Sequence, residues 1–236
     1  MDRFEDTFDA EALDETRWLP YYLPHWSSRR QARANYEVGG GRLRLLIEEG
    51  QEPWCPEFDG DVRVSSLQTG TLDGQHKFNP DAVVREPQRP ARLYTPQYGR
   101  IEIRCKAHDD PRVMVALWMI GFEDEPEHSG EICVCEIFGR DVGEGEAGVG
   151  VGVHPFGDPA LIDDFETVRV PIDARQFHVY AADWTPDAVG FYVDDQLVKH
   201  VAQSPSYPMQ LMLNIYEFER GGGYPKAFEV DYVTGG

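Results

Sequence analysis

Short segments in which apolar and polar residues alternate recur along this chain, with the period of two that is typical of β-strands buried on one face. In residues 100–107, Ile101, Ile103 and Cys105 alternate with charged residues. Residues 113–120 are instead a continuous apolar run, which predicts a strand buried on both faces. Further strands are predicted in 4–18, 42–47, 62–68, 131–138, 177–184, 189–193, 197–201, 211–218 and 228–233.

The segments between these strands are rich in turn and loop residues. The glycines at 39–41 and the pair Asp194 and Asp195 each predict a tight turn. Residues 19–36 form an aromatic loop suited to a cleft wall, residues 50–97 are also loop-rich, and the pattern assigns no strand to the glycine cluster at 143–152. No stretch shows an apolar stripe at helical spacing for more than two turns. The chain is therefore predicted to be all-β, a sandwich of antiparallel sheets in one domain spanning residues 1–236.

The charge and composition of the chain limit the kinds of molecule that it is expected to bind. The net charge is −20 at pH 7, which disfavours nucleic acid and anionic membrane surfaces, because both attract Lys and Arg. A glycan ligand is expected to be neutral for the same reason. No apolar run approaches the ~20 residues of a membrane span, and no signal peptide is visible at the start. We expect a cytoplasmic protein, or a secreted one if an export signal has been removed.

The four cysteines, Cys55, Cys105, Cys133 and Cys135, lack the spacing of a disulfide scaffold or a zinc site. They are predicted to be buried free thiols.

The stretch with the most chemical content is Ser129-Gly130-Glu131-Ile132-Cys133-Val134-Cys135-Glu136. Glu131 and Glu136 lie five apart on a predicted strand, so a regular strand would send them to opposite faces. A β-bulge at Val134 or Cys135 would return both to one face. Two carboxyl groups brought to about 5.5 Å would suit a retaining glycosidase. Two solvent-facing charges are the alternative from this fragment alone.

Several segments together resemble glycoside hydrolase family 16, the retaining β-glucanases with a β-jelly-roll fold. The active-site strand is similar to the family's laminarinase-like Glu-Ile-Asp-Ile-x-Glu motif, with Cys133 at the position of the family's Asp. The other matching segments are residues 98–104 (Tyr-Gly-Arg-Ile-Glu-Ile-Arg), 116–119 (Ala-Leu-Trp-Met), 177–187 (Phe-His-Val-Tyr through Trp-Thr-Pro-Asp), 208–214 and 230–233.

The resemblance implies a β-jelly-roll sandwich of two antiparallel sheets with a concave substrate cleft. It also implies that Glu131 is the nucleophile and Glu136 the acid/base, whose pKa should be raised so that it stays protonated. The family's Asp tunes the nucleophile, and a thiol is a weak hydrogen-bond partner, so Cys133 puts activity in doubt.

The resemblance suggests further site residues, each with a structural alternative such as core packing or loop capping. The candidate substrate-binding residues are Trp118, Trp184, His154, Asn35, Asn214 and Trp26. A structural calcium away from the cleft would use Asp231 with the carbonyls of Thr7 and Gly41, and no cofactor is expected for catalysis.

The leading hypothesis is a monomeric retaining endo-β-glycosidase that hydrolyses a neutral β-glucan with β-1,3 or mixed β-1,3/1,4 linkages. The alternatives are a catalytically impaired, lectin-like carbohydrate-binding protein and a transglycosylase that uses the same covalent intermediate.

Overall fold

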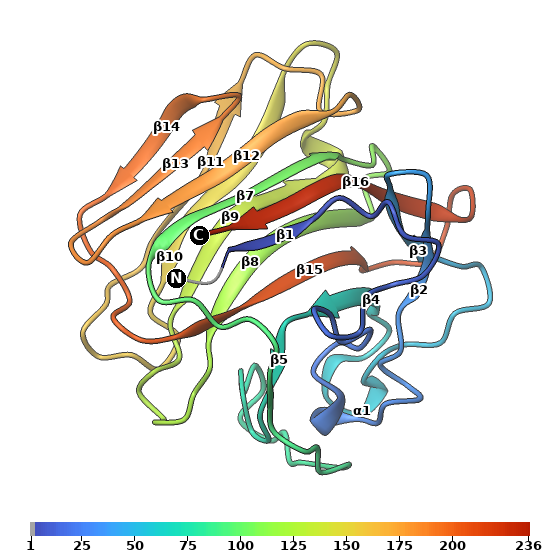
Figure 1. Cartoon of the computed structure of the whole chain (residues 1–236). Coiled ribbons are helices and arrows are strands. Elements are labelled where there is room, and N and C mark those ends of the chain that lie inside the picture. The colour runs from blue at the N-terminus through green and yellow to red at the C-terminus, as the bar shows by residue number, and fades with distance from the viewer. Residues whose placement is uncertain (1–2) are drawn as a thin grey trace.

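The alternating segments pair into two antiparallel sheets that pack face to face (Figure 1). The computed structural model describes residues 3–236. The eight-stranded sheet contains, in spatial order, β14 (Gln196–Val201), β13 (Val189–Val193), β12 (His178–Trp184), β7 (Gly99–Lys106), β16 (Lys226–Gly235), β3 (Leu43–Ile47) and β2 (Asn35–Val38), and β1 (Phe4–Asp6) also pairs with β16. The six-stranded sheet contains β11 (Asp164–Val170), β10 (Ala147–His154), β9 (Glu131–Phe138), β8 (Val113–Gly121), β15 (Met209–Glu217) and β4 (Arg63–Gln68).

The remaining elements are short. Strands β5 (Gly70–Thr71) and β6 (Ala91–Arg92) form a two-stranded ribbon. The helix α1 (Pro56–Asp59) and two 3₁₀ turns, Pro24–Trp26 and Gly139–Asp141, are single turns. None of the helices within residues 3–236 is long and apolar enough to cross a membrane. The prediction of an all-β sandwich is confirmed.

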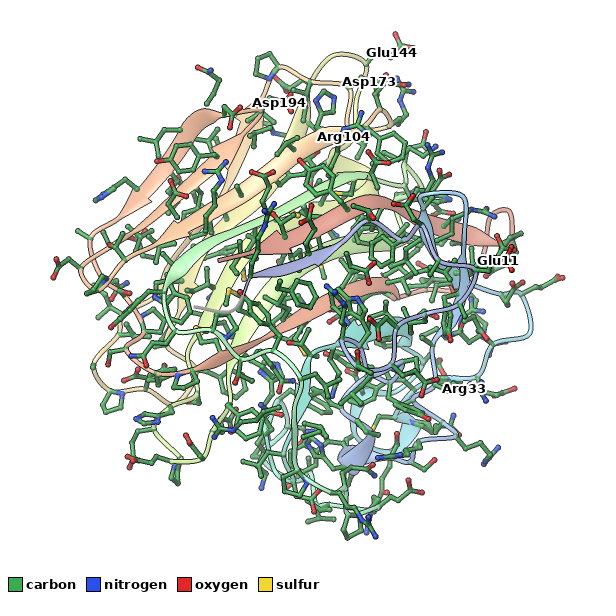
Figure 2. The ribbon with its side chains drawn as sticks, in the orientation of Figure 1. Glu11, Arg33, Arg104, Glu144, Asp173 and Asp194 are labelled. Carbon is green, nitrogen blue, oxygen red and sulfur yellow. The ribbon has the colours of Figure 1, made fainter. Side chains whose placement is uncertain are left out.

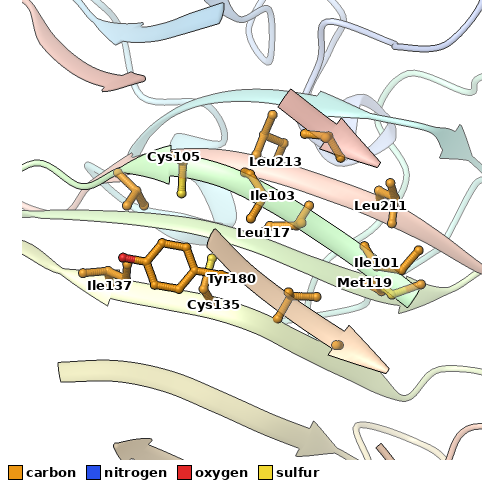
Figure 3. Close-up of a cluster of buried hydrophobic side chains, with 14 of the residues drawn as sticks. Ile101, Ile103, Cys105, Leu117, Met119, Cys135, Ile137, Tyr180, Leu211 and Leu213 are labelled. Carbon is orange, nitrogen blue, oxygen red and sulfur yellow. The ribbon is translucent and has the colours of Figure 1, made fainter. Parts of the chain in front are cut away.

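The main core fills the space between the two sheets (Figure 3). On β7, Ile101, Ile103 and Cys105 point inward and are fully buried, as the alternation predicts. They meet Leu117 of β8 and Leu213 of β15 in the same cluster. All nine residues of β8 are buried, which confirms the prediction from its apolar run.

The predicted turns are also present. Gly39, Gly40 and Gly41 have φ values of 144°, 63° and 73° between β2 and β3. Asp194 and Asp195 have φ values of 46° and 61° in the two-residue connection of β13 to β14, the backbone of a type I′ hairpin turn.

Five strands lie where no strand was predicted: β2, β10, β11 and the two-residue strands β5 and β6. Strand β10 reads Ala-Gly-Val-Gly-Val-Gly-Val-His, and its glycine content hides the alternation. The valines at 149, 151 and 153 enter the core between the sheets, while the glycines at 148, 150 and 152 lie on the opposite face.

That opposite face of the six-stranded sheet is called the site face below. A second apolar cluster lies on it, in which Ala116, Trp118, Cys133, Met212 and Tyr216 of the sheet meet side chains of the loops that precede β7. In Figure 1 these loops, which carry α1 and β5, lie next to β4 at the end of the sheet. They therefore cover part of the site face, from β4 across to Cys133 of β9.

Candidate active site

A β-bulge on β9 brings the two glutamates to the same face. Cys133 pairs with Trp118 of β8, whereas Cys135 pairs with Leu117, so Val134 is the extra residue. Val134 and Cys135 both enter the core between the sheets, and Figure 3 shows Cys135 there beside Tyr180 and Ile137. Glu131, Cys133 and Glu136 consequently all belong to the site face. The predicted bulge at Val134 or Cys135 is confirmed.

Both carboxyl groups have raised pKa values, for related reasons. Burial raises the pKa of Glu131 to about 8, and the negative charges of Glu136, Glu123 and Asp163 add to the effect. Burial also raises the pKa of Glu136, against the opposing influence of His154 and of a hydrogen bond from Cys133. The family resemblance implied a raised pKa for Glu136 alone. Because Glu131 is only 8% exposed, water stabilises its anion poorly.

Cys133 lies between the two glutamates and is fully buried. Its thiol donates a hydrogen bond to Glu136 Oε1 over a Sγ–Oε1 distance of 3.6 Å. Burial, followed by the charges of Glu136 and Glu131, raises the pKa of this thiol well above its ordinary value. Cys133 is therefore a neutral donor and not a thiolate nucleophile.

One residue beside the pair was not singled out from the sequence. His76, in the connection from β5 to β6, places Nδ1 3.5 Å from Glu131 Oε1. Its ring stacks on Phe156 and meets Trp118 edge-on, with ring centroids 4.4 Å and 5.1 Å apart. No sequence signal pointed to His76, because it lies in a loop-rich stretch without periodicity.

Three of the predicted substrate-binding residues lie on the same sheet as the pair. His154 of β10 is the direct cross-strand neighbour of Glu131, and its Nδ1 lies 2.8 Å from Asp163 Oδ1. The other two are Trp118 of β8 and Asn214 of β15, and the Trp118 indole N–H donates a hydrogen bond to Asn214 Oδ1. The second amide nitrogen of Asn214, Nδ2, is buried and has no partner in the described chain. Because Asn214 is fully buried, this donor is not open to a ligand in the structure.

The other three predicted binding residues lie elsewhere. Trp184 is in the core between the sheets, because side chains alternate along β12 and residues 180, 182 and 184 all face inward. Its indole N–H donates to Ser204 Oγ at 2.8 Å. Trp26 is 2% exposed and donates to the Gln75 carbonyl at 3.0 Å, so it supports the loop that carries His76. Asn35 lies on the edge strand β2 and donates to Gln51 Oε1 at 2.9 Å.

The aromatic rings that do reach solvent near the pair are phenylalanines. Phe156 is 43% exposed and covers His76. Phe165 of β11 is half-buried and stacks on His154 at 4.6 Å. A Cβ added at Gly150, the cross-strand neighbour of Glu136, would lie 2.6 Å from Phe165 Cζ. The ring therefore occupies the space beside Glu136 that this glycine leaves free, and an apolar ring there suits the C–H face of a sugar.

Asp231, the side chain suggested for a calcium ion, has another partner. Its carboxylate forms an ion pair with the Arg104 guanidinium, and Arg104 is labelled in Figure 2. A cation bound to Asp231 would meet the positive charge of Arg104, which disfavours calcium there. The carbonyl ligands suggested at Thr7 and Gly41 stay a prediction. Within residues 3–236, no group of three or more His, Cys, Asp or Glu side chains is arranged to hold a metal.

Comparison with known proteins gives a consistent result. The model of glycosyl hydrolases family 16 matches residues 93–233. A β-glucanase of Rhodothermus marinus is 33% identical over 273 residues, covering 98% of this chain and 82% of the relative.

Among solved structures, a GlcNAcα1-4Gal releasing endo-β-galactosidase from Clostridium perfringens superposes with a TM-score of 0.89 and 31% identity over 98% of this chain. The match covers 61% of that longer chain. The catalytic domain of an endo-1,3-β-glucanase (laminarinase) from Thermotoga petrophila gives a TM-score of 0.70 at 20% identity, covering 98% of this chain and 95% of that one.

Proposed function

Because this chain belongs to glycosyl hydrolases family 16 and is a glycoside hydrolase, we propose that it cleaves a neutral β-linked polysaccharide internally, with retention of configuration at the anomeric carbon. The observation that carries the proposal is the bulge at Val134. It places Glu131 and Glu136 on one face with raised pKa values, four residues from one another in effective strand register.

In the proposed reaction, a carboxylate oxygen of Glu131 forms a bond to the anomeric carbon as the glycosidic C–O bond breaks. The leaving oxygen takes the proton of Glu136, so the first half produces a glycosyl-enzyme and a free sugar hydroxyl. A water molecule then attacks the anomeric carbon and gives a proton to Glu136, which releases Glu131 as a carboxylate. The two inversions together retain the configuration.

Cys133 fits this scheme as a neutral neighbour. A carboxylate at position 133 would be a third negative charge beside Glu131 and Glu136, whereas the thiol adds no charge and donates a weak hydrogen bond to Glu136. Since that bond favours the anion of Glu136, loss of the thiol should make Glu136 a weaker acid. Cys133 therefore modulates the acid/base in the proposed mechanism and does not react itself.

The substrate class proposed first is a neutral β-glucan with β-1,3 or mixed β-1,3/1,4 linkages. The Rhodothermus marinus β-glucanase supports it through 33% identity over nearly the whole chain. The net charge of −20 supports a neutral polymer over a sulfated or uronic-acid one, because like charges repel.

One observation favours a second substrate class. The TM-score of 0.89 to the Clostridium perfringens endo-β-galactosidase exceeds the 0.70 obtained with the Thermotoga petrophila laminarinase, and the identity is also higher. Loops that carry substrate contacts contribute to such a difference. A β-galactoside with a GlcNAcα1-4Gal end is therefore the second candidate.

The test is the release of reducing ends from a panel of polymers: a β-1,3-glucan, a mixed-linkage β-1,3/1,4-glucan, a β-1,4-glucan and a galactose-containing glycan with GlcNAcα1-4Gal ends. The proteins are the wild type, Glu131→Gln, Glu136→Gln, Cys133→Asp and, as a matched control, Glu127→Gln, which changes an exposed carboxylate on the neighbouring loop. Gel retardation on the same polymers measures binding separately.

We expect release by the wild type and by Glu127→Gln, and a loss of at least about 10³-fold in both catalytic variants. A faster Cys133→Asp variant would show that the scaffold is intact and that the cysteine limits the rate. If the wild type released no reducing ends from any polymer while every variant still bound, the hydrolase hypothesis would be refuted and a lectin-like protein would take its place. Longer products in the presence of an added oligosaccharide acceptor would indicate a transglycosylase.

A further inference from the structure

We propose that His76 is a positioning residue for Glu131: its Nδ1–H faces the nucleophile carboxylate and holds it toward the sugar, in place of a hydrogen-bond partner on β9 itself. The proposal rests on the proposed function of Glu131. It concerns a loop residue outside the bulged strand and assigns no contact between His76 and substrate.

The contact between His76 and Glu131 is made by one defined atom of each side chain. His76 Nδ1 lies 3.5 Å from Glu131 Oε1, and Nδ1 is a buried atom with no hydrogen-bond partner in the described chain. The distance is at the long end for a hydrogen bond, which is common in catalytic sites before substrate closes them. Burial lowers the pKa of His76 to about 3, so the ring is neutral and carries a single N–H, which the proposal assigns to Nδ1.

The ring of His76 is fixed by its neighbours. Phe156 stacks on it with an interplanar angle of 16°, and Trp118 meets it at 61°. Only 8% of His76 is exposed. Because both rings restrict rotation of the imidazole, the Nδ1–H keeps its direction toward Glu131 at little entropic cost.

The backbone around this contact is strained. His76, Glu123 and Phe156 have φ values of 52°, 58° and 49°, although none is glycine. His76 contacts both of the others: its amide N–H donates to Glu123 Oε1 at 2.6 Å, and its ring stacks on Phe156. Each such residue costs on the order of 1–3 kcal/mol. Of the eight such residues in the described chain, three therefore meet at His76, which puts backbone strain beside the Glu131 carboxylate.

The need for an external partner follows from Cys133. The position between the glutamates has a thiol that turns to Glu136, so Glu131 has no side-chain hydrogen bond from its own strand among the described residues. The charged and titratable groups that face the contact are Glu123 and His25 around His76, and Glu136, Glu123 and Asp163 around Glu131. His76 is the neutral donor in this set.

Two substitutions separate hydrogen bonding from packing. His76→Phe keeps an aromatic ring between Phe156 and Trp118 but has no N–H. His76→Asn has no ring, but its amide nitrogen reproduces the position of Nδ1, and Asn tolerates a positive φ. The matched control is His128→Phe, because His128 also stacks on an aromatic ring, Tyr207 at 4.5 Å, and pairs with Asp124 instead of Glu131.

Steady-state kinetics on the substrate found in the panel is the first measurement. We expect His76→Phe to lower kcat about 10- to 100-fold, as for one hydrogen bond to a charged group, with KM nearly unchanged. Its pH profile should shift to higher pH, because loss of the donor disfavours the Glu131 anion. His76→Asn should recover most of kcat, and His128→Phe should resemble the wild type.

The second measurement does not need activity. Titration of glutamate side chains by ¹³C NMR, with the Glu131 signal assigned by its absence in Glu131→Gln, gives the pKa of Glu131 in each folded variant. We expect a pKa above the wild-type value in His76→Phe and one near it in His76→Asn. An unchanged Glu131 pKa in His76→Phe would overturn the proposal. An inactive wild type with the expected titration would instead refute the proposed function and leave the His76–Glu131 contact standing.

Discussion

Glu131 and Glu136 must occupy different protonation states for retaining hydrolysis, one ionised and the other protonated. Their raised pKa values have a common cause, which is the poor solvation of two carboxyl groups on a largely covered face. Glu131 is the more strongly perturbed because it is more buried and faces Glu136, Glu123 and Asp163 together. The pair thus titrates at higher pH than isolated glutamates, as two coupled steps.

A bell-shaped dependence of kcat/KM on pH follows for the free enzyme. Below the lower step both carboxyls are protonated and there is no nucleophile, and above the upper step both are ionised and there is no acid. Because Glu131, the nucleophile, must lose a proton that it holds with a pKa of about 8, we expect the ascending limb to extend toward pH 8. Initial rates from pH 4 to 10 on the best substrate provide the measurement. A profile whose upper limb falls below pH 6 would contradict this assignment of the pKa values.

Sequence reasoning singled out the pair Glu131 and Glu136 but not all of its surroundings. The spacing of Glu131 and Glu136 required a bulge for both to act together, and the bulge is there. His76 and Phe156 could not be found in the same way, because contacts made by a loop depend on tertiary structure and leave no periodic pattern. Trp184 matched a family segment, yet its place on the inward face of β12 puts it in the core.

Strand β10 shows how a glycine-rich segment builds the site. Its glycines leave room for the side chains of β11 to lie over the sheet, and Phe165 uses this room to reach His154 and the neighbourhood of Glu136. The sequence pattern assigned no strand here, since glycine is depleted in strands in general. The valines on the other face were the signal for a strand, with an apolar residue at every second position.

Gly152→Ala tests this close packing of β10. A Cβ at position 152 would lie 2.3 Å from the Asp164 carbonyl oxygen and 2.5 Å from Phe165 Cα. Both are backbone atoms, which cannot move away without displacing β11. We expect the free energy of unfolding to fall by about 2 kcal/mol, measured by urea denaturation. Gly50→Ala is the control, since nothing lies within 4 Å of its added Cβ. Equal stability of the two variants would show that β11 can move away from β10.

The two sheets are joined by polar contacts as well as by the core. Arg63 of β4, Glu217 of β15 and Lys226 of β16 are fully buried. The Lys226 ammonium lies 2.6 Å from Glu217 Oε1 and 2.8 Å from Asp110 Oδ2, and Arg63 also pairs with Glu217. This network connects the eight-stranded sheet to the six-stranded sheet at one end of the sandwich. The sequence gives no sign of it, because its members are distant along the chain.

Lys226→Ala should destabilise the whole molecule. Removing the ammonium leaves Glu217 and Asp110 with less compensation in a buried setting, and we expect a loss of about 3 kcal/mol in the free energy of unfolding. Urea denaturation with an unchanged m-value would measure it. Arg3→Ala, which breaks an exposed pair with Glu5, should leave the midpoint where it is. A Lys226→Ala midpoint equal to that of the wild type would mean that the network adds no net stability.

The central claim is that Glu131 and Glu136 work as a retaining pair although Cys133 lies between them. The most direct measurement is ¹H NMR of the anomeric protons of the new reducing end during hydrolysis by the wild-type protein. We expect the β-anomer to appear first and the α-anomer to follow only by mutarotation. An α-anomer formed first would show inversion and would rule out a retaining pair.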